Sequence, residues 1–203
     1  NSVVATIGAE AMGAGIRTVT FTDTGGATDA LTVAAAFTAD LTVNLDAGAN
    51  ANTVTASAYT GNLTVAATAA VMAAADHVVT GGTGTNTLTV TSAGADAVIG
   101  MTSITNVESI NLVDDGDAVV DTLTITLVDA NVADGATLTI DASGQTTDDA
   151  TINLSADTNG NNVVNGGAGV DTITLSASDL ADNITTNAGI DIINFASANL
   201  TSI

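Results

Sequence analysis

Short segments in which an aliphatic residue alternates with Thr, Asn or Ser constrain this chain more than any other feature. A period of two places the aliphatic residues on one face of a β-strand, and Thr, Val and Ile favour strands. Loops of Gly, Asn, Asp and Ala separate the segments, so the pattern predicts an all-β chain with very short connections. Eleven such runs lie at 17–22, 30–34, 40–45, 52–57, 62–67, 86–91, 108–113, 121–128, 137–140, 150–154 and 171–175.

The composition indicates how these strands pack. Hydrophobic residues make up 46% of the 203 residues, but there are only three Phe and one Tyr. A thin core of small aliphatic side chains suits stacked coils, so we expect a parallel β-solenoid or β-roll-like stack with at most one or two short helical turns. The helical candidates are the Ala-rich stretch Val65–Asp76 and the Ser-capped stretch Ser176–Ile184.

The same rhythm on both sides of residue 90 predicts one continuous domain, with a solenoid segment at 1–90 and another at 91–203. The repeat frame is lost around 91–110, where we expect a break in the stack. The chain starts with Asn1 and ends on another strand-like pattern. We therefore expect a fragment of a longer protein.

The charge balance excludes several classes of partner. The chain has one Arg, no Lys and 22 acids, of which 20 are Asp, for a formal net charge of −21. Such a surface repels nucleic acid and anionic membranes, and it suits divalent cations. There is no Cys to form disulfides and no apolar run as long as a membrane span. We expect no nucleic-acid partner and no membrane insertion.

Internal repeats follow the nonapeptide frame G-G-x-G-x-D-x-U-x, in which U is a large aliphatic residue. Gly166–Thr174 matches it completely, and the stretch directly before it fits with Asn162 at the acidic place. An earlier pair has the same layout, with His77 and Asn86 at the acidic place. Further copies carry Asn52 and Asp191 there. These other copies are Asp157–Asn165, Met72–Thr80, Gly81–Thr89, Ala47–Thr55 and Thr186–Asn194.

These residues resemble the repeats-in-toxin (RTX) family, and more broadly the Thr-, Ala-, Gly- and Asp-rich bacterial surface-layer and adhesin-like proteins that carry such repeats. The motif covers about a third of the chain, and the composition and strand rhythm extend the likeness to nearly all of it. The chain departs from the family in one respect. Only Asp171 and Asp191 keep Asp at the acidic place, so this is not a long run of intact turns.

The resemblance implies that Ca²⁺ lies between stacked turns. In a coil of about 18 residues, alternate nonapeptides stack on the same side, which places the copy at Thr186 against Gly166–Thr174. The implied ligands are hard oxygen atoms, which calcium prefers. They are the carboxylates of Asp171 and Asp191 and the carbonyls around Gly167, Gly169, Asn187 and Gly189.

Other polar residues leave two interpretations open. Asn86 and Asn162 could offer a side-chain carbonyl to calcium, or could simply bond their own backbone in turns. The acidic loops with Asp114 and Asp117 and at 129–135 carry spaced oxygen ligands that could bind calcium, but the second lacks the spacing and closing Glu of an EF-hand, and both are less clear than the repeats. Asp148–Asp149 is interpreted as a solvated turn.

We predict no enzymatic activity. With one His, one Arg and no Cys, no hydrolase constellation can be assembled, and His77 is interpreted as a hydrogen-bonded surface residue. Two Asp could serve a glycosidase, but sugar sites usually present aromatic platforms and Tyr59 stands nearly alone. The Thr-x-Thr runs invite an ice-binding interpretation, which we disfavour because Thr is the ordinary solvent-side residue of such strands.

The expected function is therefore structural. The sequence predicts a calcium-stabilised protein, secreted to the cell surface, that assembles with copies of itself through β edges or faces into a layer, filament or matrix. The chain has no Lys and no Pro to block the edges. Cell-surface polysaccharide is a second candidate partner. The alternatives are a repeat or stalk module of a secreted adhesin, or the carrier domain of a type I secreted enzyme.

Overall fold

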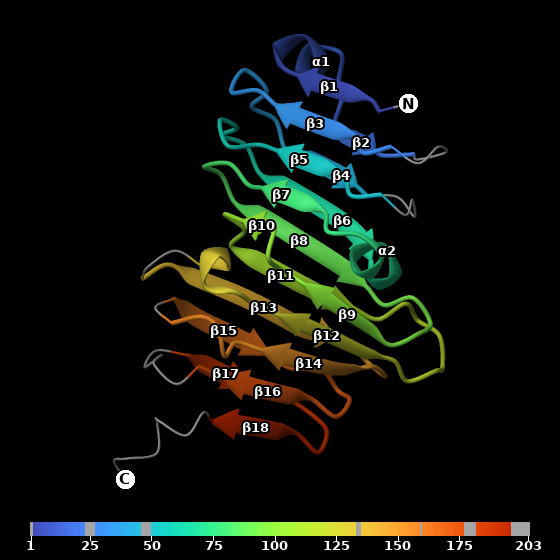
Figure 1. Cartoon of the computed structure of the whole chain (residues 1–203), viewed down its shortest axis with the longest axis vertical. Coiled ribbons are helices and arrows are strands. Elements are labelled where there is room, and N and C mark those ends of the chain that lie inside the picture. The colour runs from blue at the N-terminus through green and yellow to red at the C-terminus, as the bar shows by residue number, and fades with distance from the viewer. Residues whose placement is uncertain are drawn as a thin grey trace.

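The chain forms a parallel β-solenoid, as the strand pattern predicted (Figure 1). The computed structural model describes residues 2–22, 27–45, 50–132, 135–158, 160–176 and 182–195. Successive coils stack along one axis, from the N-terminus at the top of Figure 1 to the C-terminal end at the bottom. Every strand pairing is parallel, and each of the eleven predicted runs contains a strand.

The strands form three sheets. Sheet A contains, in order, β1 (Val4–Ile7), β3 (Ala30–Val33), β5 (Thr53–Thr55), β7 (Val78–Thr80) and β10 (Ile104–Thr105). Sheet B contains β2 (Thr18–Thr20), β4 (Leu41–Asn44), β6 (Leu63–Thr68), β8 (Asn86–Thr91), β11 (Ser109–Val113), β13 (Thr137–Gly144), β15 (Asn161–Asn165) and β17 (Asn183–Thr185). Sheet C contains β9 (Ala97–Gly100), β12 (Thr122–Thr126), β14 (Asp149–Asn153), β16 (Thr172–Leu175) and β18 (Ile192–Phe195).

Sheet B runs through the whole stack, whereas sheet A accompanies it in the N-terminal part and sheet C in the C-terminal part. The exchange takes place in two coils that contribute a strand to all three sheets, β7–β8–β9 and β10–β11–β12. The break expected around 91–110 is therefore wrong. The repeat frame disappears there because the coil gains a third strand, while β8 and β11 remain paired in sheet B.

Short helices cover the two sheet edges that this exchange creates. Helix α2 (Ala69–Ala74) follows β6 and packs against β9, where sheet C begins. The 3₁₀ helix η1 (Asp129–Asn131) packs against β10, where sheet A ends. Its Asn131 Nδ2 donates hydrogen bonds of 2.6 Å to the carbonyl oxygens of Met101 and Ile104. An edge that is covered in this way cannot pair with another chain.

The two helical predictions have different outcomes. Within Val65–Asp76, strand β6 continues to Thr68, and the helix is confined to Ala69–Ala74. Thr68 caps this helix by accepting a hydrogen bond from the Val71 N–H at 3.3 Å. Of Ser176–Ile184, residues 177–181 lie outside the described residues, and Ile184 belongs to strand β17. Helix α1 (Ala9–Gly13), beside β1, was not predicted.

The core consists of columns of aliphatic side chains that repeat from coil to coil. In sheet C, one register column contains Ile99, Ile125, Ile152 and Ile173, all fully buried. Each such side chain contributes about 1.5–3 kcal/mol relative to an exposed one. In the N-terminal part, the rings of Phe37 and Tyr59 fill the coil, with centroids 6.0 Å apart. The alternation in the sequence thus places the aliphatic residues in buried columns and the Thr residues in columns on the outward face.

Candidate functional site

A row of aspartates lies at the corner where the chain enters sheet C. Asp148 Oδ1 accepts the backbone N–H of Asp121 at 3.1 Å, and Asp171 Oδ1 accepts that of Ala150 at 2.9 Å. In the last described coil, Asp191 Oδ1 accepts the N–H of Asp171 at 3.0 Å. Each of these carboxylates therefore caps a backbone donor of the preceding coil.

The same bond recurs at the start of sheet A with other residue types. Asp29 Oδ1 accepts the N–H of Val3 at 2.6 Å, and Asn52 Oδ1 accepts that of Asp29 at 3.3 Å. His77 Nδ1 in turn accepts the N–H of Asn52 at 3.1 Å. At four copies of the nonapeptide, the residue at the acidic place is such a cap: Asp171, Asp191, Asn52 and His77.

His77 is buried, with 2% of its surface exposed, so its interpretation as a surface residue is wrong. Its Nε2 lies 3.1 Å from the Val71 carbonyl oxygen and donates to it, because Nδ1 already acts as an acceptor. Burial lowers the pKa of His77, against the opposing effects of the Val71 bond and the Asp76 charge. The ring is therefore a neutral cap.

The glycines of the repeat are required by how closely the corners stack. A Cβ on Gly169 would lie 2.3 Å from the Asp148 carbonyl oxygen, and one on Gly84 would lie 2.2 Å from that of Gly61. Gly189 must be glycine for two reasons, its positive φ and the lack of space for a Cβ. Its φ is 132°, and a Cβ there would lie 1.9 Å from the Gly169 carbonyl oxygen.

Six of the predicted calcium ligands meet at one corner. Thr172 pairs with Ile192 in the register of β16 and β18, which confirms the predicted stacking of the last two repeats. Asp171, Asp191, Gly167, Gly169, Asn187 and Gly189 all belong to these stacked turns.

Several of these groups already have bonds within the protein. Asp171 Oδ2 accepts the N–H of Gly167 at 2.7 Å, and Asn187 Nδ2 donates to the Gly166 carbonyl oxygen at 2.6 Å. Burial raises the pKa of Asp171, and the charges of Asp191 and Asp149 add to this against two backbone hydrogen bonds. A cation beside this carboxylate would therefore be favourable.

Asn86 and Asn162 lie apart from this corner, at the starts of β8 and β15 in sheet B. Asn86 accepts the N–H of Gly82 at 3.0 Å and donates to the carbonyl oxygens of Gly82 and Gly84 at 3.1 and 3.0 Å. These bonds lie within the turn that contains Asn86, so they agree with the interpretation of Asn86 as a residue that bonds its own backbone. Asn162 Nδ2 donates to Asp157 Oδ2 at 2.7 Å, and its buried Oδ1 has no hydrogen-bond partner among the described residues.

Both oxygens of the Asp114 carboxylate accept hydrogen bonds from neutral donors. Its Oδ2 accepts the backbone N–H and hydroxyl groups of Thr146 and Thr147 at 2.7–3.2 Å, and its Oδ1 accepts the N–H of Gly116 at 2.7 Å. These bonds, led by the Thr146 hydroxyl, hold the pKa of Asp114 well below its usual range. Asp117 is exposed on the same loop, with one oxygen near Gly94.

The interpretation of Asp148–Asp149 as a solvated turn is wrong for Asp148, which is fully buried. Its Oδ2 accepts a 2.5 Å hydrogen bond from Ser92 Oγ, across two coils of the stack. Two further buried polar residues of this corner, Asp121 and Gln145, were not predicted from the sequence. A signal was present, since Asp121 is the first residue of the predicted run 121–128, but no glycine frame marks it.

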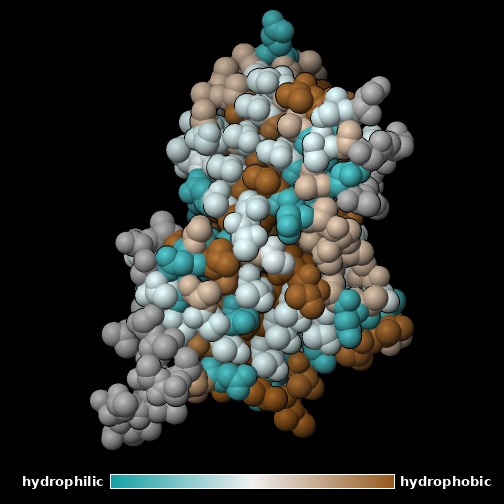
Figure 2. Space-filling model, in the orientation of Figure 1, coloured by the Kyte–Doolittle hydropathy of each residue, from teal (hydrophilic) through white to brown (hydrophobic). Residues whose placement is uncertain are grey.

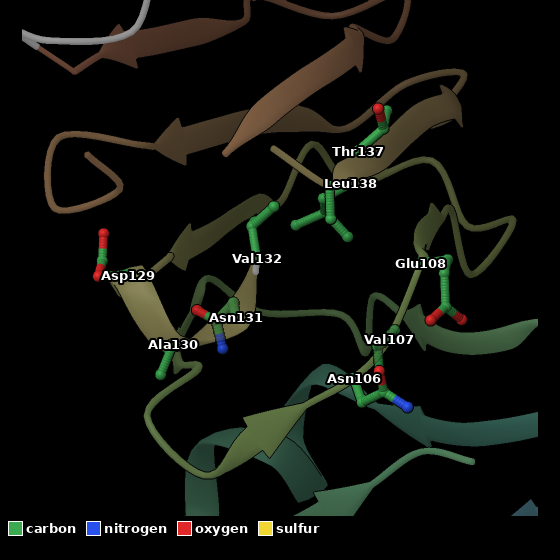
Figure 3. A pocket seen from close by; sticks show the side chains of 10 residues that line it. Asn106, Val107, Glu108, Asp129, Ala130, Asn131, Val132, Thr137 and Leu138 are labelled. Atoms are coloured by element: carbon green, nitrogen blue, oxygen red, sulfur yellow. The ribbon is translucent and has the colours of Figure 1, made fainter. Parts of the chain in front are cut away.

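A cavity of about 570 Å³ opens where sheet A ends (Figure 3). Glu108 lies on one side of it and Asp129 on the other, with Val132 and Leu138 between them. Asp129 Oδ1 accepts the N–H and hydroxyl of Thr158 at 3.0 and 2.7 Å, and Glu108 Oε2 accepts the Asn86 N–H at 2.7 Å. Both carboxylates therefore already have structural partners.

Comparisons with known proteins leave the residues themselves as the basis for a functional argument. No protein-family model, no curated protein and no solved structure matches the chain. Within the described ranges, no three Asp, Glu or His side chains lie close enough together to hold a metal ion. Nor does any helix in the described part have the length and apolar character needed to cross a membrane. The fold defines the class of the molecule as a parallel β-solenoid.

Proposed function

We propose that the protein is a structural, calcium-stabilised solenoid, secreted to the cell surface, that assembles end to end with copies of itself. The observation that carries the proposal is the open C-terminal coil. Ile193 continues the isoleucine column of sheet C, yet 38% of its surface is exposed, whereas Ile173 one coil earlier is fully buried. Ile192 and Phe195 on the same strand are about half exposed, at 50% and 54%.

Hydrophobic side chains gather around this end, at the bottom of the view in Figure 2. A further coil stacked on this end of the molecule would cover them. A second copy of the chain would supply that coil. Such head-to-tail contacts use two different surfaces and therefore generate an open filament rather than a closed dimer.

Sheet B provides the register for this contact. Its terminal strands, β2 and β17, lie at opposite ends of the stack and each pairs with only one described neighbour. Joining β17 of one copy to β2 of the next would continue sheet B as a parallel ladder. Sheets A and C need not continue across such a junction. Within one chain, sheet B already continues through the coils in which sheet A ends and sheet C begins.

The charge of the chain supports the calcium part of the proposal. Its only strong base, Arg17, lies near the N-terminal end, so the other coils carry acids without a partner base. Copies of a chain with net charge −21 repel each other, and divalent cations reduce this repulsion. Extracellular calcium-binding modules have dissociation constants of about 10⁻⁴–10⁻³ M, so a weak calcium site of this kind favours assembly outside the cell.

The test replaces the apolar end with charge. The double variant Ile192→Lys, Phe195→Lys should remain monomeric in sedimentation at millimolar calcium, where the parent chain forms filaments visible by electron microscopy. Val98→Lys is the matched control, since Val98 is 68% exposed on sheet C but lies away from the open end. Monomeric parent protein at every calcium concentration would refute assembly.

The alternative is that further coils of a longer chain cover this end, as in an adhesin stalk or the carrier domain of a secreted enzyme. The same exposed isoleucines favour it. It predicts that adding the natural flanking residues to the chain abolishes filaments and raises the melting temperature, which the self-assembly proposal does not.

A further inference from the structure

One register position of sheet B begins with the only strong base of the chain and ends with an acid. Arg17 directly precedes β2, and Asp182 directly precedes β17, at opposite ends of the stack (Figure 1). The residues that follow them, Thr18 and Asn183, belong to one column that pairs from coil to coil through all of sheet B. Arg17 and Asp182 therefore occupy equivalent places in the first and last described strands of this sheet.

Asp182 has a carboxylate oxygen that its own chain does not satisfy. Its Oδ1 accepts the N–H of Asn162, in the preceding coil, at 2.9 Å. Its Oδ2 is buried and has no hydrogen-bond partner among the described residues. A carboxylate oxygen that loses water without gaining a donor is unfavourable, and a nearby positive charge offsets this cost. Since β17 pairs with β15 alone in the described stack, a further strand beside β17 could bring such a charge.

Side chains at this register position do reach each other between adjacent coils. Asn86 and Glu108 hold the same place directly before the paired residues Thr87 and Ser109. The Asn86 Nδ2 donates a hydrogen bond to Glu108 Oε2 at 3.0 Å. A nitrogen donor in one coil therefore contacts a carboxylate in the next at this position.

Arg17 is exposed, and its guanidinium makes only backbone contacts in the described part of the chain. Its Nη1 donates to the carbonyl oxygens of Ile16 and Met12 at 2.7 and 3.4 Å. Asp40 lines the same surface groove but forms no ion pair with it. A guanidinium has five N–H donors, so Arg17 can also bind a carboxylate of another molecule. Strand β2, like β17, pairs with one described neighbour only.

The N-terminal coil also offers apolar surface. A hollow of about 160 Å³ lies between its strands, and its lining includes Val3, Val19, Phe21 and Leu31. Val3 is 59% exposed. The N-terminal coil thus combines a positive charge with an apolar hollow, which complements the acidic C-terminal coil and its exposed isoleucines.

We propose that Arg17 of a second copy lies over Asp182 of the first and compensates its charge, so that this ion pair selects which ends meet. Because Arg17 is the only strong base, a contact between two C-terminal coils would bring together acids without a base. Complementary charges of this kind determine specificity and register more than affinity. The inference rests on the proposed end-to-end assembly and adds the two residues that define the junction.

The experiment reverses each charge separately. Arg17→Glu and Asp182→Arg each place like charges at the junction. Either variant alone should raise the critical concentration for filaments in millimolar calcium at least about tenfold, measured by sedimentation. Asp117→Arg is the matched control, since it changes the net charge as much as Asp182→Arg does, at an exposed position in the middle of the stack. It should assemble like the parent chain.

Mixing the two variants provides the sharpest result. In an equal mixture, every junction between unlike variants again joins an acid to a base. Alternating filaments should therefore form although neither variant forms them alone, and the double variant Arg17→Glu, Asp182→Arg should assemble by itself. If the parent forms filaments and each single reversal does so equally well, the ion pair is refuted while assembly stands. If the parent never forms filaments, both proposals fail.

Arg17→Glu keeps the test decisive if Asp182→Arg does not fold, because it alters an exposed side chain. Its assembly should recover when Asp182→Asn is added. This second change removes the like charge and retains the oxygen that accepts the Asn162 N–H. An absence of recovery would show that Arg17 does not act at Asp182 and would overturn the proposal.

Discussion

The N-terminal and C-terminal parts of the stack build the same corner with different chemistry. In the N-terminal part, Asn52 and His77 are neutral caps, and Phe37 and Tyr59 fill the coil. In the C-terminal part, buried aspartates cap the strands. Sixteen of the 22 acids follow residue 90. The backbone bond is the same in both parts, so stacking does not require charge.

This difference indicates what the aspartates add. A neutral Asn or His satisfies a backbone donor without adding a charge, whereas a buried carboxylate adds a charge that must be compensated. The C-terminal part should therefore respond to cations, and the N-terminal part should depend on packing.

Tyr59→Ala should destabilise the protein by about 4 kcal/mol, since it empties a fully buried aromatic site. The Tyr59 hydroxyl also donates to the carbonyl oxygens of Ala39 and Asn62. Burial, together with the Asp40 charge, raises its pKa to about 12, so it remains a donor. Urea unfolding followed by circular dichroism should give the same loss in calcium and in chelator. A loss that calcium abolishes would contradict the division.

Gly84→Ala and Gly169→Ala should each cost about 2–3 kcal/mol, because the added Cβ would meet a backbone carbonyl oxygen of the neighbouring coil. One glycine lies in each part of the stack, so equal losses are expected if the corners share one geometry. Gly100→Ala is the control, because a Cβ there meets nothing within 4 Å. Melting temperatures of the three variants provide the measurement.

Acidification should weaken the N-terminal part through His77. Its folded pKa is lowered below 6.5, so stability is complete above pH 6.5 and is lost as the pH falls toward the folded pKa. The slope is at most about 1.4 kcal/mol per pH unit. His77→Asn should remove this slope between pH 7.5 and 5.5 in urea titrations, since Asn caps the equivalent place at Asn52. An unchanged slope would exclude His77 as its source.

The smallest effect is expected on the outward face of sheet B, which both parts share. Thr64→Ala and Thr139→Ala replace half-buried residues of one outward column and should each change stability by no more than about 0.5 kcal/mol. A clearly larger loss for Thr139→Ala would show that the two parts differ beyond their corners.

The sequence was sufficient to predict the solenoid, because strand alternation is local information. It also predicted the stacking of Asp171 on Asp191, since a repeat of fixed length determines which turns meet. The sequence could not show the exchange from sheet A to sheet C, because that depends on which neighbour a strand joins. β9 and β10 are short, and neither was among the predicted runs.

The candidate site was predicted less completely for a related reason. The glycine frame marks Asp171 and Asp191 in the sequence. Asp121 becomes unusual only through burial and the absence of a donor, and both arise from the coils above and below it. The burial of His77 escaped prediction in the same way, because its partners Asn52 and Val71 come from a different coil and from helix α2.

The exchange of sheets also has a mechanical consequence. Between β7–β8–β9 and β10–β11–β12, three parallel ladders join adjacent coils, whereas two ladders join the coils on either side. Tension applied along the stack should therefore peel coils from both ends and leave the middle intact longest. In a single-molecule pulling trace, the last event should be the separation of these two coils. The junction between the N-terminal and C-terminal parts would then be the position in the solenoid that withstands the highest force.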